Sequence, residues 1–312
     1  MAKDNTKILL IVIGLISLAA SFAFGGGFAA SMTVWLAVNV LLAVSFRFVQ
    51  LIGELNFAVA AFAGIGAYAA GIATTLLGWN IVVAFLLAAI SAGVISALVG
   101  FITLRAKGPY FLLVSFAFTE VVRMIYTQVE VIGGNSGMIG IFPPDALYPY
   151  YPTFAVAVAA ILTYVLYHME KSDLGKVFVA IRNNDAVVET VGIGVHAKKV
   201  LCLTIASVAA GIAGALLAFS NSVISPGDFS FILAVYVLAY VKVGGESNIL
   251  GAVAGALLMT FIAQFSLSFG ALEHIFFGAA IVLAVLLMPD GLYGLVTRLF
   301  GARKPKAATQ HH

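Results

Sequence analysis

Charged side chains are scarce in this sequence. They make up 9% of the 312 residues, whereas soluble domains carry about a quarter. Hydrophobic residues account for 62%, and the mean hydropathy is +1.12. So few charges cannot cover a surface exposed to water. The composition therefore excludes an ordinary soluble protein and indicates a polytopic membrane protein.

Cysteine and the common catalytic motifs are also missing or nearly so. The single cysteine, Cys202, excludes an intramolecular disulfide and leaves no cysteine-based metal site. The sequence contains no GxxxxGK(S/T) phosphate-binding loop, no HExxH and no GxSxG. We therefore expect no enzyme activity, no catalytic or metal-binding residues and no cofactor in this chain.

Long apolar runs are abundant instead. A membrane-spanning helix needs about 20 residues, at about 1.5 Å rise each across about 30 Å of hydrocarbon. Hydropathy predicts an all-α membrane bundle of about ten segments, of which 31–46 and 229–243 are short enough to be tilted, broken or re-entrant. The predicted segments are 8–24, 31–46, 55–77, 81–103, 110–128, 153–169, 199–220, 229–243, 248–269 and 273–289.

The positions of the basic residues give this layout an orientation. With the N-terminus inside, every lysine and arginine except Arg123 falls in a cytoplasmic segment or at the cytoplasmic end of a span. Lys199 and Lys242 are at such ends, where their long side chains can reach the membrane interface. The opposite side carries only acidic charges. We therefore expect both termini in the cytoplasm.

Arg123 is predicted about half-way along the apolar stretch PYFLLVSFAFTEVVRMIY (109–126). A lone charge at the bilayer centre costs about 2.5–3.5 kcal/mol on insertion scales. Glu120 lies one helical turn earlier on the same face, so the two side chains can pair inside the membrane. We interpret them as a structural pair that faces the bundle interior; the alternative is a direct role in gating or solute passage.

Small residues dominate several spans. Examples are AFAGIGAYAAGIA (61–73), AAGIAGALLA (209–218) and GAVAGALL (251–258), in which Gly251 and Gly255 form a GxxxG pair. Glycine and alanine at spacings of three or four let helices approach closely in lipid. The pattern predicts a compact bundle.

A few uncharged polar residues lie in or near the spans. They are Asn39, Asn56 and Gln264. Hydrogen bonds between helices are the default interpretation of such side chains. The alternative is that these three residues line a translocation path.

One long polar segment, 170–198, interrupts the apolar runs and is the only sizeable cytoplasmic loop apart from the C-terminal tail. Its apolar residues fall near one helical face and its charged residues elsewhere, which predicts a short amphipathic helix. The apolar face consists of Val177, Ile181, Val188 and Val191. The segment either docks on a partner or lies in the membrane interface without binding anything.

Several longer stretches follow one another in a characteristic order. They are LRAKGPYFLLVSFAFTEVVRMIY, VIGGNSGMIGI, the run from SDLGKVFVAIRNNDAVVETVGIG to ISPGDFSF, VKVGGESNILGAVAGALL and MPDGLYGL. Over roughly residues 45–295 the chain resembles the inner-membrane permease subunits of branched-chain amino-acid ABC importers. The resemblance implies a transmembrane permease domain over 1–298, with a coupling loop at 170–198. It leaves a cytoplasmic tail at 299–312, whose final histidines look like the remnant of an affinity tag.

The resemblance also implies roles for individual residues. The coupling loop of such permeases docks on an ATPase subunit, and here that role would fall to Gly175, Ile181, Arg182, Asn183, Asn184, Asp185, Glu189 and Gly192. The family's extracellular glycine motif matches at Gly133, Gly134, Asn135 and Gly137. The stretch NFAVAA (56–61) departs from the Ser/Gly/His-containing stretch that is usual there, which leaves the solute open.

The implied function is a permease that moves a small solute, branched-chain or related amino acids, from a binding protein into the cytoplasm. Relatives of this type also handle urea, short amides and aromatic or other carboxylates. The implied partners are a second permease, identical or homologous, two ATPase subunits that hold ATP–Mg, and a periplasmic or surface-tethered solute-binding protein. Membrane lipid surrounds the bundle in the cytoplasmic membrane of a bacterium or archaeon, and no nucleic acid is expected. The alternative is an ATP-independent carrier or channel.

Overall fold

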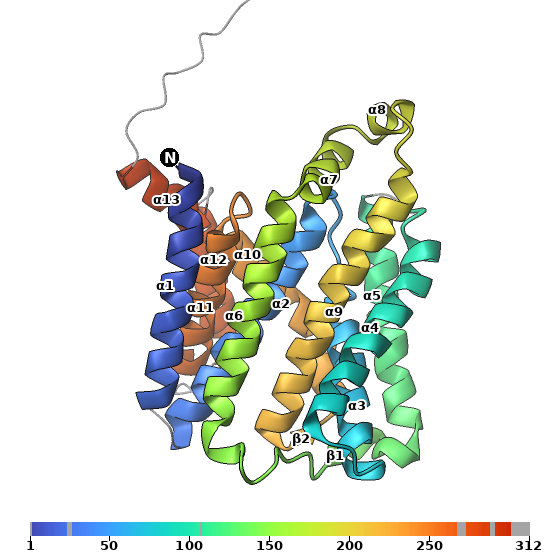
Figure 1. The fold of residues 1–312 in the computed structure, drawn as a ribbon, viewed down its shortest axis with the longest axis vertical. Coiled ribbons are helices and arrows are strands. Elements are labelled where there is room, and N and C mark those ends of the chain that lie inside the picture. Colours follow the sequence, from blue (N-terminus) through green and yellow to red (C-terminus); the bar gives the residue numbers. More distant parts are fainter. Residues whose placement is uncertain (1, 24–26, 107, 267–272, 288–290, 301–312) are drawn as a thin grey trace, which may run out of the picture.

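The structure is a computed structural model that describes residues 2–23, 27–106, 108–266, 273–287 and 291–300. Its long helices run side by side along one axis (Figure 1). At one end, α7 (Asp173–Asn183) and α8 (Asp185–Thr190) project from the bundle. At the other, β1 (Met138–Ile139) pairs antiparallel with β2 (Val223–Ile224). We call these the α8 end and the ribbon end.

The remaining helices form the bundle itself. In chain order they are α1 (Ala2–Ala23), α2 (Gly27–Gln50), α3 (Val59–Gly71), α4 (Ile81–Thr103), α5 (Pro109–Gln128), α6 (Tyr151–Lys171), α9 (Val195–Asn221), α10 (Phe231–Gly244), α11 (Ile249–Ser266), α12 (Glu273–Leu287) and α13 (Gly291–Phe300). A π-helical turn, Ile72–Leu76, continues α3, and a 3-10 turn, Pro226–Phe229, precedes α10.

Seven of the described helices are long and apolar enough to cross a membrane. They are Gly27–Gln50, Val59–Leu76, Ile81–Thr103, Pro109–Gln128, Tyr148–Lys171, Val195–Asn221 and Ile249–Ser266. Thr6–Ala19 and Phe231–Gly244 are apolar but shorter. The prediction of an all-helical, polytopic membrane protein is confirmed.

Three predicted boundaries differ from the structure. The short segment 31–46 is part of α2 (24 residues), which begins four residues earlier at Gly27 and continues through the buried polar side chains of Arg47 and Gln50. The predicted span 55–77 begins in an irregular stretch, and α3 starts only at Val59. The boundary at 298 falls inside α13, and the tail 301–312 with its two histidines lies outside the described residues.

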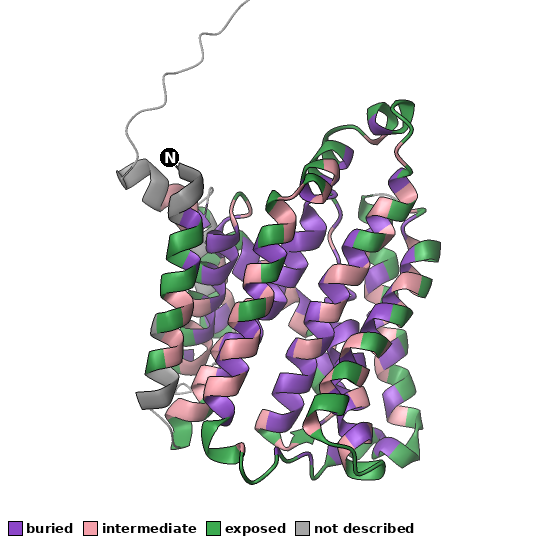
Figure 2. Ribbon diagram, viewed as in Figure 1, coloured by how far each residue is buried: buried purple, intermediate pink, exposed green. Residues whose placement is uncertain are grey.

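The centre of the bundle is formed by α2, α3 and α9, where buried residues concentrate (Figure 2). Helices α3 and α9 touch backbone to backbone along Ala63, Gly66, Gly211 and Gly214, which we call the α3–α9 seam. A Cβ atom on Gly66 would overlap the Gly211 carbonyl, and one on Gly214 would overlap the Ala63 carbonyl. The close packing predicted from small residues is confirmed here.

The GxxxG pair makes a second contact of this kind. Gly251 and Gly255 lie on α11, and Cβ atoms there would overlap the carbonyl oxygens of Gly245 and Tyr240. These two carbonyls belong to α10 and to the turn that follows it. The pair therefore seats α11 directly against α10.

Candidate functional site

The polar segment at the α8 end is two helices, so the prediction of one amphipathic helix is wrong. Asn184 has an extended backbone (φ −162°, ψ 103°) and separates α7 from α8. Its side-chain oxygen accepts a hydrogen bond from the Val187 N–H at 3.3 Å, and Asp185 follows in the first turn of α8. An asparagine cap followed by an acidic residue favours a new helix start, which breaks the segment at this point.

Helix α7 is anchored to the bundle at its buried face. Gly175 packs on the end of α6, where a Cβ atom would overlap the Glu170 carbonyl. Phe178 is fully buried, with its ring edge-to-face on Phe48 of α2 at 5.9 Å between centroids. Gly175 therefore sets α7 close against α6, and the Phe178–Phe48 contact holds α7 to α2.

Helix α8 rests on the bundle through a small apolar cluster. Ile181, Val188 and Val195 are buried together. Val191, predicted on the same face, is instead 71% exposed, since α8 ends at Thr190 and Val191 lies beyond it in the turn to α9. The outward surface of α7 and α8 thus mixes exposed apolar and polar residues: Val179, Arg182, Asn183, Val187, Glu189 and Val191.

A glycine turn leads from α8 to α9. Gly192 has φ +80°, a backbone conformation that side chains with a Cβ rarely adopt. Its N–H donates to the Glu189 carbonyl at 2.9 Å, which closes the end of α8. Gly192 is therefore required by backbone geometry rather than by packing, since no atom lies within 4 Å of a Cβ placed there.

Lys199 was predicted to reach the membrane interface, but its side chain turns into the bundle. Its side chain is 7% exposed and its Nζ lies 3.2 Å from Oε1 of Glu54, which is 4% exposed. The other carboxylate oxygen of Glu54 accepts the Gly108 N–H at 3.0 Å. The pair joins α9 to the residues before α3 and before α5. Sequence reasoning missed it because nothing in the local pattern links positions so distant in the chain.

A second buried ion pair lies at the same end. The Arg47 guanidinium donates to both carboxylate oxygens of Glu170, at 2.7 and 3.1 Å. Its Nε donates to the Glu246 carbonyl at 3.0 Å. The side chains of Arg47 and Glu170 are 4% and 9% exposed. This pair ties α2, α6 and the turn after α10 together, and it too was not predicted.

The irregular stretch between α2 and α3 runs through the bundle with its polar backbone satisfied. The Phe57 N–H donates to Ser115 Oγ at 3.1 Å, and its carbonyl accepts from Thr119 Oγ1 at 3.0 Å. Asn56, 2% exposed, accepts the Ala58 N–H at 3.1 Å. Irregular backbone at membrane depth is tolerated when protein groups satisfy it, and α5 does so here.

The three polar residues considered for a translocation path lie on different elements. Asn39 of α2 donates to Thr260 Oγ1 of α11 at 3.0 Å, which is the interhelical hydrogen bond expected of it. Asn56 acts locally at the start of α3. Gln264 is partly exposed near the ribbon end of α11. The three residues thus lie apart on separate elements, and their role in a path stays a prediction.

Glu120 and Arg123 form the predicted pair, with 2.7 Å between Oε2 and Nε. Arg123 lies past the middle of α5 (Pro109–Gln128), toward the ribbon end. The side chains are 24% and 35% exposed, so the pair lies at the bundle surface rather than in its interior. Oε1 of Glu120 accepts the Phe231 N–H at 3.3 Å, which connects the pair to the start of α10.

The glycine motif near the ribbon end is shaped by its backbone. Gly133, Gly134 and Gly137 have φ of +89°, +52° and +80°. A Cβ atom on Gly137 would overlap the Ile224 carbonyl of β2, so the loop can lie against the ribbon only with glycine there. Asn135 is exposed between them. The motif folds the loop between α5 and β1 tightly onto this end.

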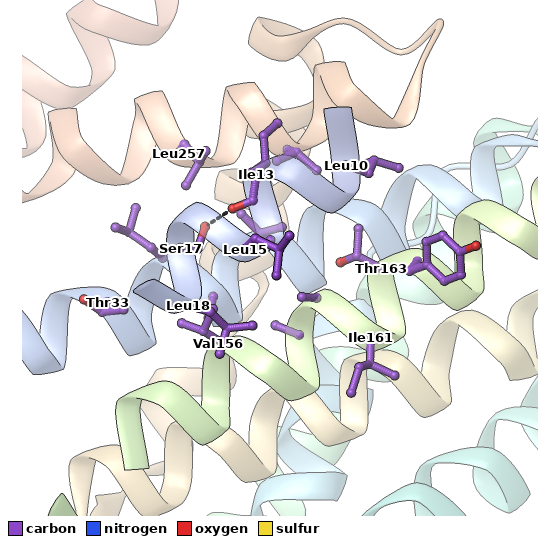
Figure 3. Close-up of a pocket in the computed structure, with 18 of the residues that line it drawn as sticks. Leu10, Ile13, Leu15, Ser17, Leu18, Thr33, Val156, Ile161, Thr163 and Leu257 are labelled. Atoms are coloured by element: carbon purple, nitrogen blue, oxygen red, sulfur yellow. Dashed lines mark hydrogen bonds between the residues drawn. The ribbon is translucent and has the colours of Figure 1, made fainter. Parts of the chain in front are cut away.

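A pocket of about 510 Å³ opens between α1, α2, α6 and α11 (Figure 3). Its lining is nearly all apolar, as Leu10, Leu15, Val156 and Leu257 illustrate, and no charged residue takes part. Ser17, which also lines it, donates to the Ile13 carbonyl of its own helix at 2.7 Å. The pocket therefore offers a solute no charged partner. Within the described residues, no cluster of three His, Cys, Asp or Glu side chains could hold a metal ion.

Comparisons with known proteins agree with one another. A family model described as "Branched-chain amino acid transport system / permease component" matches residues 28–285. The chain is 24% identical over 318 residues to the "High-affinity branched-chain amino acid transport system permease protein LivM" of Escherichia coli (strain K12). It is 25% identical over 324 residues to the protein of the same description from Salmonella typhimurium (strain LT2). Each alignment covers 92% of this chain and 74% of the relative. No solved structure matches the chain significantly.

Proposed function

Because the chain belongs to the branched-chain amino acid permease family, we propose that it forms the membrane pathway of an ABC importer for branched-chain or related amino acids. The family match over residues 28–285 carries this proposal. The chain is a transport subunit and not an enzyme, and a separate subunit hydrolyses ATP. Membership of this family argues against the alternative of an ATP-independent carrier.

We assign about ten membrane segments, with both termini in the cytoplasm. Besides the seven long helices, α1, α10 and α12 would complete this count. Basic residues at the α8 end support the orientation: Arg47 ends α2, Lys171 ends α6, and Lys242 is in the last turn of α10. The ribbon end instead carries Asp228. An excess of Lys and Arg marks the cytoplasmic side, here of a bacterial or archaeal cytoplasmic membrane.

The outward surface of α7 and α8 is the proposed docking site for an ATPase subunit. Val187 and Val191 are 59% and 71% exposed beside the exposed Arg182. Apolar side chains next to a charge, on helices that project beyond the membrane segments, suit a protein partner. The complete importer would contain two ATPases with ATP–Mg, a second permease (identical or homologous) and a solute-binding protein at the ribbon end.

The Glu120–Arg123 pair supports the position of the solute path. A partly exposed ion pair inside a membrane segment requires water or protein beside it rather than acyl chains. We therefore assign this face of α5 to the path or to the contact with the second permease. ATP-driven closure of the ATPases would push on α7 and α8 and shift the bundle between outward-facing and inward-facing states.

The test of this function is transport by the whole assembly. The chain is co-expressed with the ATPase, permease and binding-protein genes beside it, purified and placed in liposomes with radiolabelled leucine. We expect co-purification of the ATPases and uptake that requires ATP, with competition by valine and isoleucine but not by urea or benzoate. Uptake that continues without ATP under an ion gradient, with no ATPase bound, would contradict the proposal.

The docking surface has its own test. The double substitution Arg182→Ala and Asp185→Ala should weaken ATPase binding or separate hydrolysis from uptake, because both side chains belong to the docking segment. The control is Asp173→Asn with Lys176→Ala, an exposed pair at the start of α7 in which Lys176 lowers the pKa of the Asp173 carboxyl. Normal leucine uptake by the first double variant would exclude coupling through these residues.

A further inference from the structure

Residues 53–58, which we call the connector, touch the docking segment at their first residue. Gly53 has φ +82°, and a Cβ atom placed on it would lie 3.3 Å from Cγ of Arg182. The aliphatic part of Arg182 therefore lies directly against the connector backbone. A displacement of the end of α7 would therefore also move residue 53.

The next residue ties the connector to two further helices. Glu54 is held by Lys199 in the first turns of α9 and by the Gly108 N–H at the start of α5. Helix α9 follows α8 directly across the Gly192 turn. Movement of α8 thus reaches Glu54 by a second route, through a buried ion pair whose geometry is restricted by the surrounding protein.

The far end of the connector is hydrogen-bonded to two hydroxyls of α5. Thr119 Oγ1 can donate to the Phe57 carbonyl at 3.0 Å or to the Ser115 carbonyl at 3.1 Å. Ser115 Oγ, which accepts the Phe57 N–H, itself donates to the Leu112 carbonyl at 2.8 Å. Neither hydroxyl would lose its donor bond if Phe57 moved. Movement of Phe57 away from α5 would instead leave its own N–H and carbonyl without these partners, so a displacement of the connector is passed on to α5.

We propose that the connector transmits movement of α7 and α8 to α5, and that Glu54 is the positioning residue that couples them. Glu120 follows Thr119 on α5 and also holds the start of α10. A shift at Thr119 would therefore reach the Glu120–Arg123 pair, on the face of α5 assigned to the solute path or to the second permease. This inference rests on the proposed function and adds to it a specific residue inside the bundle, away from the docking surface.

The experiment measures leucine uptake and ATP hydrolysis in the same liposomes that contain the whole importer. Glu54→Gln keeps a hydrogen-bond acceptor for Gly108 but removes the charge that holds Lys199. We expect ATPase binding and hydrolysis to persist while leucine transported per ATP falls about fivefold or more, the lower end of usual coupling energies. Thr119→Val, which cuts the far end of the connector, should lower the ratio in the same direction.

Two control variants separate coupling from general damage. Arg47→Met with Glu170→Gln removes the other buried pair at the α8 end, whose hydrogen bonds do not reach the connector. Thr204→Val removes a hydroxyl that bonds only within its own helix, to the Val200 carbonyl. Both controls should leave the leucine-to-ATP ratio unchanged, even where the purified protein is less stable. An equal fall in the ratio in either control would overturn the proposal.

Hydrogen exchange supplies a readout that a structural role would not affect. In the wild-type importer, trapping the ATPases with ATP and vanadate should change exchange both in residues 184–191 and in residues 115–123. In Glu54→Gln only the first segment should respond. A response of both segments in this variant would overturn the proposal.

The two levels of failure are distinguishable. If the wild-type importer takes up no leucine with ATP, the proposed function fails. If it does so and Glu54→Gln keeps the wild-type ratio, only the connector proposal fails.

Discussion

The α3–α9 seam and the connector lie in the same bundle but hold it together in opposite ways. In the seam, Gly66 and Gly214 bring two backbones so close that no Cβ atom fits. In the connector, contact runs through side chains: a carboxylate on Lys199 and two hydroxyls on Phe57. The seam is held by direct contact of two backbones, whereas the connector is held by hydrogen bonds and an ion pair that involve side chains.

This difference indicates which parts of a transport bundle can move. Backbone contacts at glycine are close-packed and transmit force without changing shape. Hydrogen bonds that have a second acceptor nearby can change partner at small cost. We therefore expect α3 and α9 to move as one body, with α5 shifting relative to them when the connector is displaced.

The largest loss of stability is expected from a side chain placed in the α3–α9 seam. Gly214→Val places a branched side chain against the Ala63 carbonyl, and neither backbone can withdraw. We expect a loss of stability at or beyond about 4–5 kcal/mol, the exceptional end for single substitutions, and little folded protein in the membrane. The amount of folded protein is measured by fluorescence-detected size-exclusion chromatography.

The matched control for the seam is Gly93→Ala on α4. A Cβ atom there would meet only a methyl group of Val208, at 3.1 Å, and that side chain can adjust. We expect nearly wild-type yield. If Gly214→Val folded as well as this control, the seam would not be the rigid part of the bundle.

The next effect tests the connector at its ion pair. Lys199→Met leaves the Glu54 carboxylate buried without its partner, which costs about 3 kcal/mol or more. The double variant Glu54→Gln with Lys199→Met removes both charges and should recover most of that stability. Thermal unfolding in detergent compares the three proteins. Equal loss in the single and double variants would show that the pair is not electrostatically coupled.

The smallest effect separates a glycine needed for its backbone from one needed for space. Gly192→Ala has room for its methyl group but must hold φ near +80°, which costs about 1–2 kcal/mol. Gly194→Ala nearby has equal room and a φ of −69°, so it should be neutral. The melting temperatures of the two variants test this difference. Equal values would mean that the turn between α8 and α9 relaxes freely.

Much of the architecture could be predicted from the sequence. Apolar runs of spanning length identify most of the long helices, and the small residues of 209–218 and 251–258 identify the close contacts. The Glu120–Arg123 pair was found because one helical turn separates the two residues. These are all local signals, because residues a few positions apart in the sequence are also neighbours on one helix.

The errors arose where local signals end. The predicted single helix at 170–198 failed because the capping of α8 by Asn184 outweighs the apolar periodicity. Lys199 was assigned to the interface because Glu54 could not be recognised as its partner. The interior position assumed for Arg123 failed because hydropathy does not say which side of a helix faces the bundle.

The sequence by itself determined that this chain is a helical membrane protein, and its ordered motifs determined the family. Periodicity and hydropathy suffice for this because a membrane accepts so few kinds of spanning structure. The tertiary structure decided that Glu54 meets Lys199, that Arg47 meets Glu170, and that α5 supports the backbone of residues 53–58. These contacts depend on how separate helices pack, since a buried charge finds its partner across the bundle rather than along the chain.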